Sequence, residues 1–130
     1  MLKPTLLAAV LCGFFSVGLG SPEANAQKAK PGRGEILFNR CRACHTLDAS
    51  EKQRLGPHLE GLFGRAAGSV DGFKYSKALS GSGFTWTEEK LDAWLENPQS
   101  FLPGNRMSFA GVRSEQDRKD LITYLKSATK

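Results

Sequence analysis

The stretch Cys41-Arg42-Ala43-Cys44-His45 carries the most specific chemistry in the chain. Two thiols three positions apart on a helical turn are spaced to add to the two vinyl groups of one haem, and the next side chain can place an imidazole under the iron. A disulfide or a thioredoxin-like dithiol would use the same cysteines, but no βαβ pattern is present and neither explains the adjacent histidine. The motif therefore predicts one haem c attached through Cys41 and Cys44, with His45 as an iron ligand.

A second iron ligand follows by elimination. The chain has two methionines, and Met1 belongs to a segment expected to be removed, so Met107 is the remaining thioether. It follows Pro103 and Gly104 in a turn-rich loop, whereas methionine more often fills a core. The alternative is His58, which would give a bis-imidazole site. We favour Met107, because thioether ligation raises the reduction potential as an electron carrier requires.

The first 26 residues have the pattern of a secretory signal. Lys3 precedes an apolar run from Leu6 to Leu19, and Ala24 and Ala26 supply small residues at a cleavage site. A membrane-spanning helix takes about 20 apolar residues, which is more than this run offers. We predict cleavage after Ala26 and export to the periplasm, where covalent haem attachment occurs in bacteria. The alternative is an uncleaved membrane anchor.

Composition and charge narrow the class of protein. The chain has 130 residues, 40% of them hydrophobic and 24% charged, with 14 Gly and three Cys. These values are typical of one soluble domain and argue against a disulfide-rich scaffold or a disordered tail. Without residues 1–26 the net charge remains +5, with 17 basic and 12 acidic side chains. No nucleic-acid motif is present, so the charge favours acidic protein partners.

The remaining pattern predicts an all-α domain over residues 34–130, after a flexible lead-in at 27–33. Apolar spacing indicates a first helix over 34–42, a second from Thr87 to a stop at Asn97-Pro98, and a last one from Ser114. Residues 46–82 are rich in glycine and show no long periodicity. So long a looped segment in a compact domain is uncommon unless the loops wrap around something, and a haem would fill that role.

Nearly the whole chain from Gly34 to Lys130 resembles the class I c-type cytochromes of the bacterial c-two and mitochondrial group. The resemblance implies the cytochrome c fold, with about three main helices and loops wrapped around one covalently bound haem. The matching stretches are GEILF (34–38), CRACHT (41–46), GPHLEGLFGR (56–65), YSKA (75–78), FTW (84–86), LENP (95–98), PGNRM (103–107) and DLITYLK (120–126).

The resemblance also implies roles for individual residues. The carbonyl of Pro57 should accept a hydrogen bond from the outer nitrogen of His45, which fixes the ring and raises its basicity. Charge and hydrogen bonds from Arg65, Tyr75 and Trp86 would hold a buried haem propionate.

Other implied roles concern packing and the side of the haem that carries the second ligand. Asn105 is expected in the haem site, and Trp94 stands where relatives usually have a tyrosine that donates to the methionine sulfur. Gly34 should let the first helix approach the last closely. The leucines implied to pack against the haem are Leu59, Leu62, Leu91, Leu95 and Leu125.

The function that the resemblance implies is one-electron transfer between respiratory or photosynthetic partners by a soluble monomer. A haem peroxidase or gas-sensing domain with a labile Met107 is the alternative, and a retained signal would make an anchored carrier. Partners would be proteins with acidic surfaces, such as a bc-type complex, a terminal oxidase, a reaction centre or a dehydrogenase. Membrane contact would come only through them. The implied docking residues are Arg40, Lys52, Arg54, Arg106 and Arg113.

Overall fold

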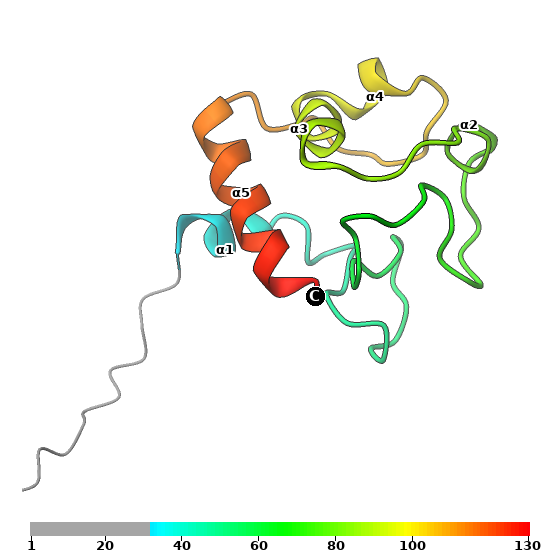
Figure 1. The fold of residues 1–130 in the computed structure, drawn as a ribbon, viewed down its shortest axis with the longest axis horizontal. Coiled ribbons are helices and arrows are strands. Elements are labelled where there is room, and N and C mark those ends of the chain that lie inside the picture. The colour runs from blue at the N-terminus through cyan, green and yellow to red at the C-terminus, as the bar shows by residue number, and fades with distance from the viewer. Residues whose placement is uncertain (1–31) are drawn as a thin grey trace, which may run out of the picture.

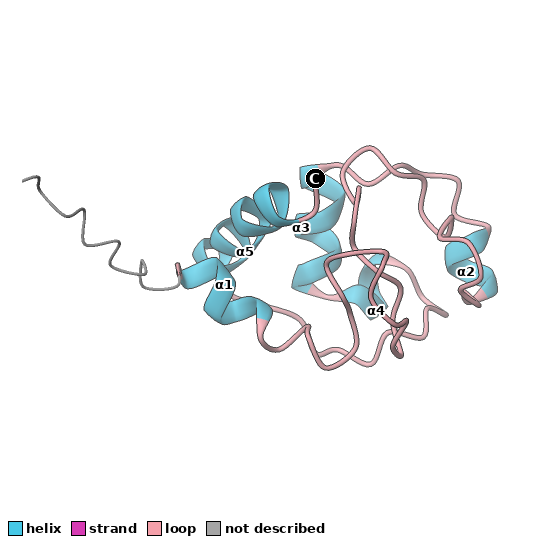
Figure 2. Cartoon of the chain, turned by 90° about the horizontal axis from the view of Figure 1, so that it is seen from below, coloured by secondary structure: helices cyan, strands magenta, loops and turns pink. Residues whose placement is uncertain are grey.

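The computed structural model describes residues 32–130, and this range is built from helices and loops. The helices are α1 (Arg33–Phe38), α2 (Lys77–Ser80), α3 (Glu88–Glu96), α4 (Pro98–Phe101) and α5 (Glu115–Ala128). Within these residues the only strand-like pairing is an isolated bridge between Ala66 and Thr85. The prediction of an all-α fold is confirmed (Figures 1 and 2). The predicted signal and most of the lead-in lie outside the described residues.

The two longest helices begin directly after Thr87 and Ser114, the residues at which the sequence predicted their starts. The Thr87 hydroxyl accepts a hydrogen bond from the Lys90 backbone N–H at 3.2 Å, and the Ser114 hydroxyl accepts one from the Asp117 N–H at 3.2 Å. Each cap satisfies one of the backbone donors that a helix leaves free at its start. Acidic residues in the first turn of both helices add a favourable interaction with the helix dipole.

The first helix was predicted over 34–42, and the structure corrects both of its ends. It begins one residue earlier, at Arg33, whose guanidinium pairs with Asp117 of α5 at 2.5 Å. It stops at Phe38, and the chain continues as turns in which His45 N–H donates to the Cys41 carbonyl at 2.9 Å. The two cysteines and the histidine therefore share a separate helical turn that follows α1.

Two short helices, α2 and α4, were not predicted. Each has four residues, too few to show a periodic pattern. Ser76 caps α2 by accepting from the Leu79 N–H at 3.1 Å, and Asn97 caps α4 by accepting from the Ser100 N–H at 3.1 Å. Pro98 stops α3 as predicted but also starts α4, because proline suits the first position of a helix.

Helices α1 and α5 cross at one end of the molecule, and α2 lies at the other (Figures 1 and 2). Gly34 makes the crossing possible, since a Cβ there would lie 2.2 Å from the Asp120 carbonyl oxygen and 2.7 Å from Tyr124 Cβ. Next to it, Phe38 is 1% exposed and its ring centroid lies 5.6 Å from that of Tyr124. Leu121 is equally buried in the same cluster.

Helix α5 also anchors α3 and the loop between α4 and α5. Arg118 is buried and pairs with Asp92 of α3 at 2.7 Å. Its other guanidinium nitrogen donates to the carbonyls of Val112 and Arg113, both at 3.0 Å. The buried charge thus has an ionic partner and two carbonyl acceptors, the condition under which a buried arginine is tolerated. Within residues 32–130 no helix has both the length and the apolarity needed to cross a membrane.

Candidate functional site

One cavity of about 690 Å³ occupies the space between the helices and the loops. Its volume is in the range of sites that bind cofactors. The structure brings to its walls every site residue that the sequence predicted. These are Cys41, Cys44, His45, Pro57, Arg65, Tyr75, Trp86, Trp94, Asn105 and Met107. The five leucines expected to pack against a haem line the same cavity, which makes the walls largely apolar.

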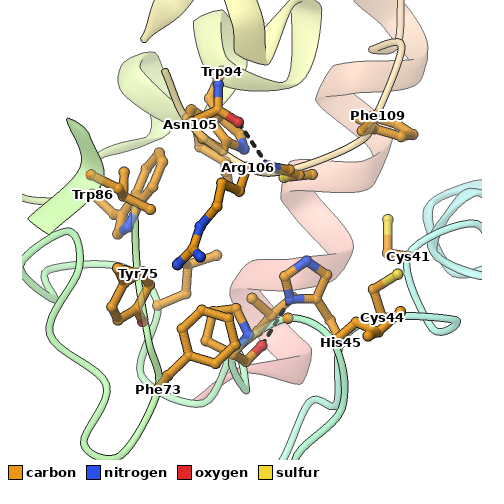
Figure 3. Close-up of a pocket in the computed structure, with 18 of the residues that line it drawn as sticks. Cys41, Cys44, His45, Phe73, Tyr75, Trp86, Trp94, Asn105, Arg106 and Phe109 are labelled. Atoms are coloured by element: carbon orange, nitrogen blue, oxygen red, sulfur yellow. Dashed lines mark hydrogen bonds between the residues drawn. The ribbon is translucent and has the colours of Figure 1, made fainter. Parts of the chain in front are cut away.

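His45 is held in one orientation by its neighbours. Its Nδ1 donates to the Pro57 carbonyl at 2.8 Å, the hydrogen bond that the resemblance implied (Figure 3). The ring packs flat against Gly56, where a Cβ would lie 2.5 Å from the ring. Burial lowers the pKa of His45, which keeps the imidazole neutral, while the bond to Pro57 acts in the opposite direction. With Nδ1 carrying the proton, Nε2 keeps a free lone pair for a metal.

Cys41 and Cys44 do not form a disulfide with each other. Burial raises the pKa of Cys41, so its thiol is protonated at neutral pH. A protonated thiol is a poor metal ligand, because metals bind the thiolate. Among the described residues no group of three or more His, Cys, Asp or Glu side chains could hold a metal ion. Within residues 32–130 the two thiols therefore lack the companion ligands that a structural zinc site uses.

Trp94 and Asn105 lie across the cavity from His45 (Figure 3). Met107, whose backbone N–H donates to Asn105 Oδ1 at 2.9 Å, lines the same cavity. Trp94 is 5% exposed, and its ring stands edge-on to Trp86 with 5.4 Å between the centroids. Met107 is partly buried on the loop that follows α4. A thioether and an imidazole thus line one cavity.

His58, the alternative to Met107, does not line this cavity. It lies instead at a second, smaller hollow together with Glu51 and Asp71. Its Nδ1 is buried and has no hydrogen-bond partner within the described residues. The structure therefore gives no support to a site with His45 and His58 as the two ligands.

Arg65, Tyr75 and Trp86 form a polar side of the cavity. Arg65 donates to the carbonyls of Glu60 at 2.5 Å and His58 at 3.0 Å. Among residues 32–130 no carboxylate forms an ion pair with Arg65, and burial lowers the pKa of its guanidinium. Burial likewise raises the pKa of Tyr75, whose hydroxyl stays a neutral donor. A partly buried cation with only carbonyl partners suits a ligand that carries a carboxylate.

Sequence reasoning missed some of the residues at the cavity. Phe73 and Phe109 line it, and the Arg40 guanidinium lies 5.4 Å from the Phe109 ring centroid. Arg106, expected on the docking surface, is exposed and also lines the cavity, where it donates to the Lys74 carbonyl (Figure 3). No motif marks these positions, although two aromatic residues in polar loops are a signal for a buried partner.

These features together fit a haem. The cavity is apolar where a porphyrin would lie and polar at Arg65 and Tyr75, where propionates would need partners. Two thiols and an oriented imidazole share one helical turn at its wall. The thioether of Met107 faces the same space.

Comparison with known proteins gives a consistent result. The family model described as cytochrome c matches residues 32–129. The cytochrome c of Stellaria longipes is 44% identical over 113 residues, which cover 86% of this chain and 100% of the relative. The cytochrome c2 of Blastochloris viridis is 43% identical over 114 residues, 88% of each chain. The cytochrome c of Arabidopsis thaliana is 46% identical over 99 residues, 75% of this chain and 88% of the relative.

Proposed function

The chain belongs to the cytochrome c family, and from this membership we propose that it is a periplasmic one-electron carrier with His45 and Met107 as axial ligands. As a member of the family it is an electron-transfer protein rather than an enzyme, and it binds one haem c through Cys41 and Cys44. One observation carries the proposal: the thiols, the His45 ring and Met107 line the same apolar cavity.

The residues at the cavity would bind and orient the haem and would not themselves be oxidised or reduced. When bound, the haem supplies an iron that gains and loses one electron. Pro57 fixes the His45 ring, and the loop after α4 places Met107 at the same cavity. Two side-chain ligands leave no position for a substrate and limit the structural change on electron transfer. Arg65 and Tyr75 would balance the propionate charge.

The proposed partners are redox proteins with acidic surfaces, among them a bc-type complex, a terminal oxidase, a reaction centre or a dehydrogenase. The proposed docking residues are all exposed: Arg40, Lys52, Arg54, Arg106 and Arg113. Arg54 and Arg106 also donate to backbone carbonyls, those of Arg42 and Lys74, so we assign these two a smaller part in docking. Opposite charges on two surfaces raise the rate of encounter more than the final affinity.

Electron exchange with hexacyanoferrate should test this electrostatic part of the proposal. The +5 charge attracts an anionic reagent, and raising ionic strength from about 0.01 M to about 1 M shortens the Debye length from about 30 Å to about 3 Å. We expect the stopped-flow rate constant to fall about tenfold or more. A cationic cobalt complex is the matched control and should speed up. If the rate constant with hexacyanoferrate does not change with ionic strength, the basic surface does not steer the encounter.

Export is tested by the mass of the purified holoprotein and by the fraction that contains it. Cleavage after Ala26 leaves 104 residues plus one haem, in the periplasmic fraction of a bacterial host. A membrane-bound protein with the mass of the full chain plus haem would replace the periplasmic proposal with the anchored carrier. Mass alone also counts the haems, because the thioether bonds survive denaturation.

A further inference from the structure

Asn105 is buried, and its side-chain amide is paired at both ends inside the loop that carries Met107. Oδ1 accepts hydrogen bonds from the Met107 backbone N–H at 2.9 Å and from Gln99 Nε2 at 3.2 Å (Figure 3 shows the Asn105 side chain). Nδ2 donates to the carbonyls of Pro98 and Leu102, both at 2.8 Å. Only one orientation of the amide fits these partners. The reverse orientation would place the NH2 group against the Met107 N–H and the amide oxygen against the two carbonyls.

Gln99 binds the second polar group of the Met107 backbone, its carbonyl. Its Nε2 donates to the Met107 carbonyl at 3.1 Å as well as to Asn105 Oδ1. The Asn105 backbone N–H also closes a turn on the Leu102 carbonyl at 3.2 Å. The backbone N–H of Met107 is therefore bound by Asn105 of the loop, and its carbonyl by Gln99 of α4. These two groups flank the Cα that carries the thioether side chain.

We propose that Asn105, assisted by Gln99, is the positioning residue that keeps Met107 in the cavity and so sets how readily the thioether is displaced. The inference rests on the proposed function, in which Met107 is the second axial ligand. The resemblance implied that Asn105 contacts the cofactor. Its polar atoms are instead used within the loop, although the residue lines the cavity.

The physical reason is that Met107 can leave the cavity only if its backbone moves. The Asn105 side chain is 8% exposed, so separating it from these partners leaves donors and acceptors away from water. An unpaired buried polar group is far more costly than the same group in solvent. The loop is therefore biased toward the one arrangement in which all these bonds are made.

Imidazole binding to the ferric holoprotein measures this bias, because imidazole competes with Met107. For Asn105→Ala we expect imidazole affinity to rise about tenfold or more, the change that the loss of one or two buried hydrogen bonds gives. Gln99→Ala should give a smaller increase in imidazole affinity. Because the Gln99 side chain is exposed, this variant should fold as the wild type does. Asn97→Ala is the matched control. It removes an asparagine cap from the same segment without touching Met107, and should stay within about twofold of wild type.

Hydrogen exchange of the Met107 amide gives a readout that does not depend on ligation. Asn105→Ala should lose protection at this amide, and Asn97→Ala should keep it, because only Asn105 accepts from it. Wild-type imidazole affinity and wild-type protection in Asn105→Ala would overturn the inference. If the wild-type protein itself lacks the optical band of methionine bound to iron, the proposed ligation fails. In that case amide protection alone decides the role of Asn105.

Discussion

Met107→Ala is expected to open the haem site to external ligands. The loop after α4 brings one thioether to the cavity, and within the described residues His58, the other candidate, lies at a separate hollow. The variant should lose the weak near-infrared band of methionine bound to ferric iron and bind carbon monoxide rapidly once reduced. Its reduction potential should fall by a large part of the roughly 0.8 V over which axial ligands act.

Ser100→Ala is the matched control for this prediction. Ser100 lies in the same segment, is exposed and does not line the cavity. Its spectrum, carbon monoxide binding and potential should equal those of the wild type. A Met107→Ala protein that keeps the near-infrared band and excludes carbon monoxide would show that another side chain holds the iron.

Gly34→Ala is expected to destabilise the fold strongly. The added Cβ would meet backbone of α5, 2.2 Å from the Asp120 carbonyl oxygen, and a backbone atom cannot rotate away as a flexible side chain can. Separating α1 from α5 would also loosen Phe38, which is 1% exposed. We expect a loss of about 3 kcal/mol in the free energy of unfolding, at the upper end for overpacked sites. Urea unfolding of the holoprotein, followed by circular dichroism, measures it.

Gly32→Ala provides the comparison for the same chemical change. No atom lies within 4 Å of a Cβ at Gly32, which precedes α1. The loss should stay below about 1 kcal/mol, the scale of a changed helix cap. Equal losses in the two variants would mean that the close approach of α1 to α5 is not what Gly34 provides.

Features that are local in sequence could be predicted well. The helix starts at Thr87 and Ser114 were recognisable because a hydroxyl just before an apolar helical pattern can accept a hydrogen bond from a free backbone N–H of the first turn. Cys41, Cys44 and His45 followed from the chemistry of one motif, whereas Pro57 came from the family resemblance. The family resemblance then supplied distant members of the wall such as Arg65, which no spacing within the chain could connect to the cysteines.

Features that depend on tertiary contacts could not be predicted. Helix α1 stops at Phe38 although the apolar pattern continues, because the next residues form the turn that presents the cysteines. Arg106 is exposed, as a surface charge is expected to be, but its hydrogen bond to the Lys74 carbonyl depends on where the two loops lie and could not be predicted. Asn105 was assigned to the right cavity, but only the hydrogen bonds show that its amide serves the methionine loop.

The most direct test of the account is the near-infrared spectrum of the ferric holoprotein, combined with carbon monoxide binding to its ferrous form. A site held by His45 and Met107 predicts the methionine-to-iron band together with no rapid uptake of carbon monoxide. A spectrum without this band, accompanied by fast carbon monoxide binding, would contradict the account. The iron would then be open, as a ligand-binding haem protein requires.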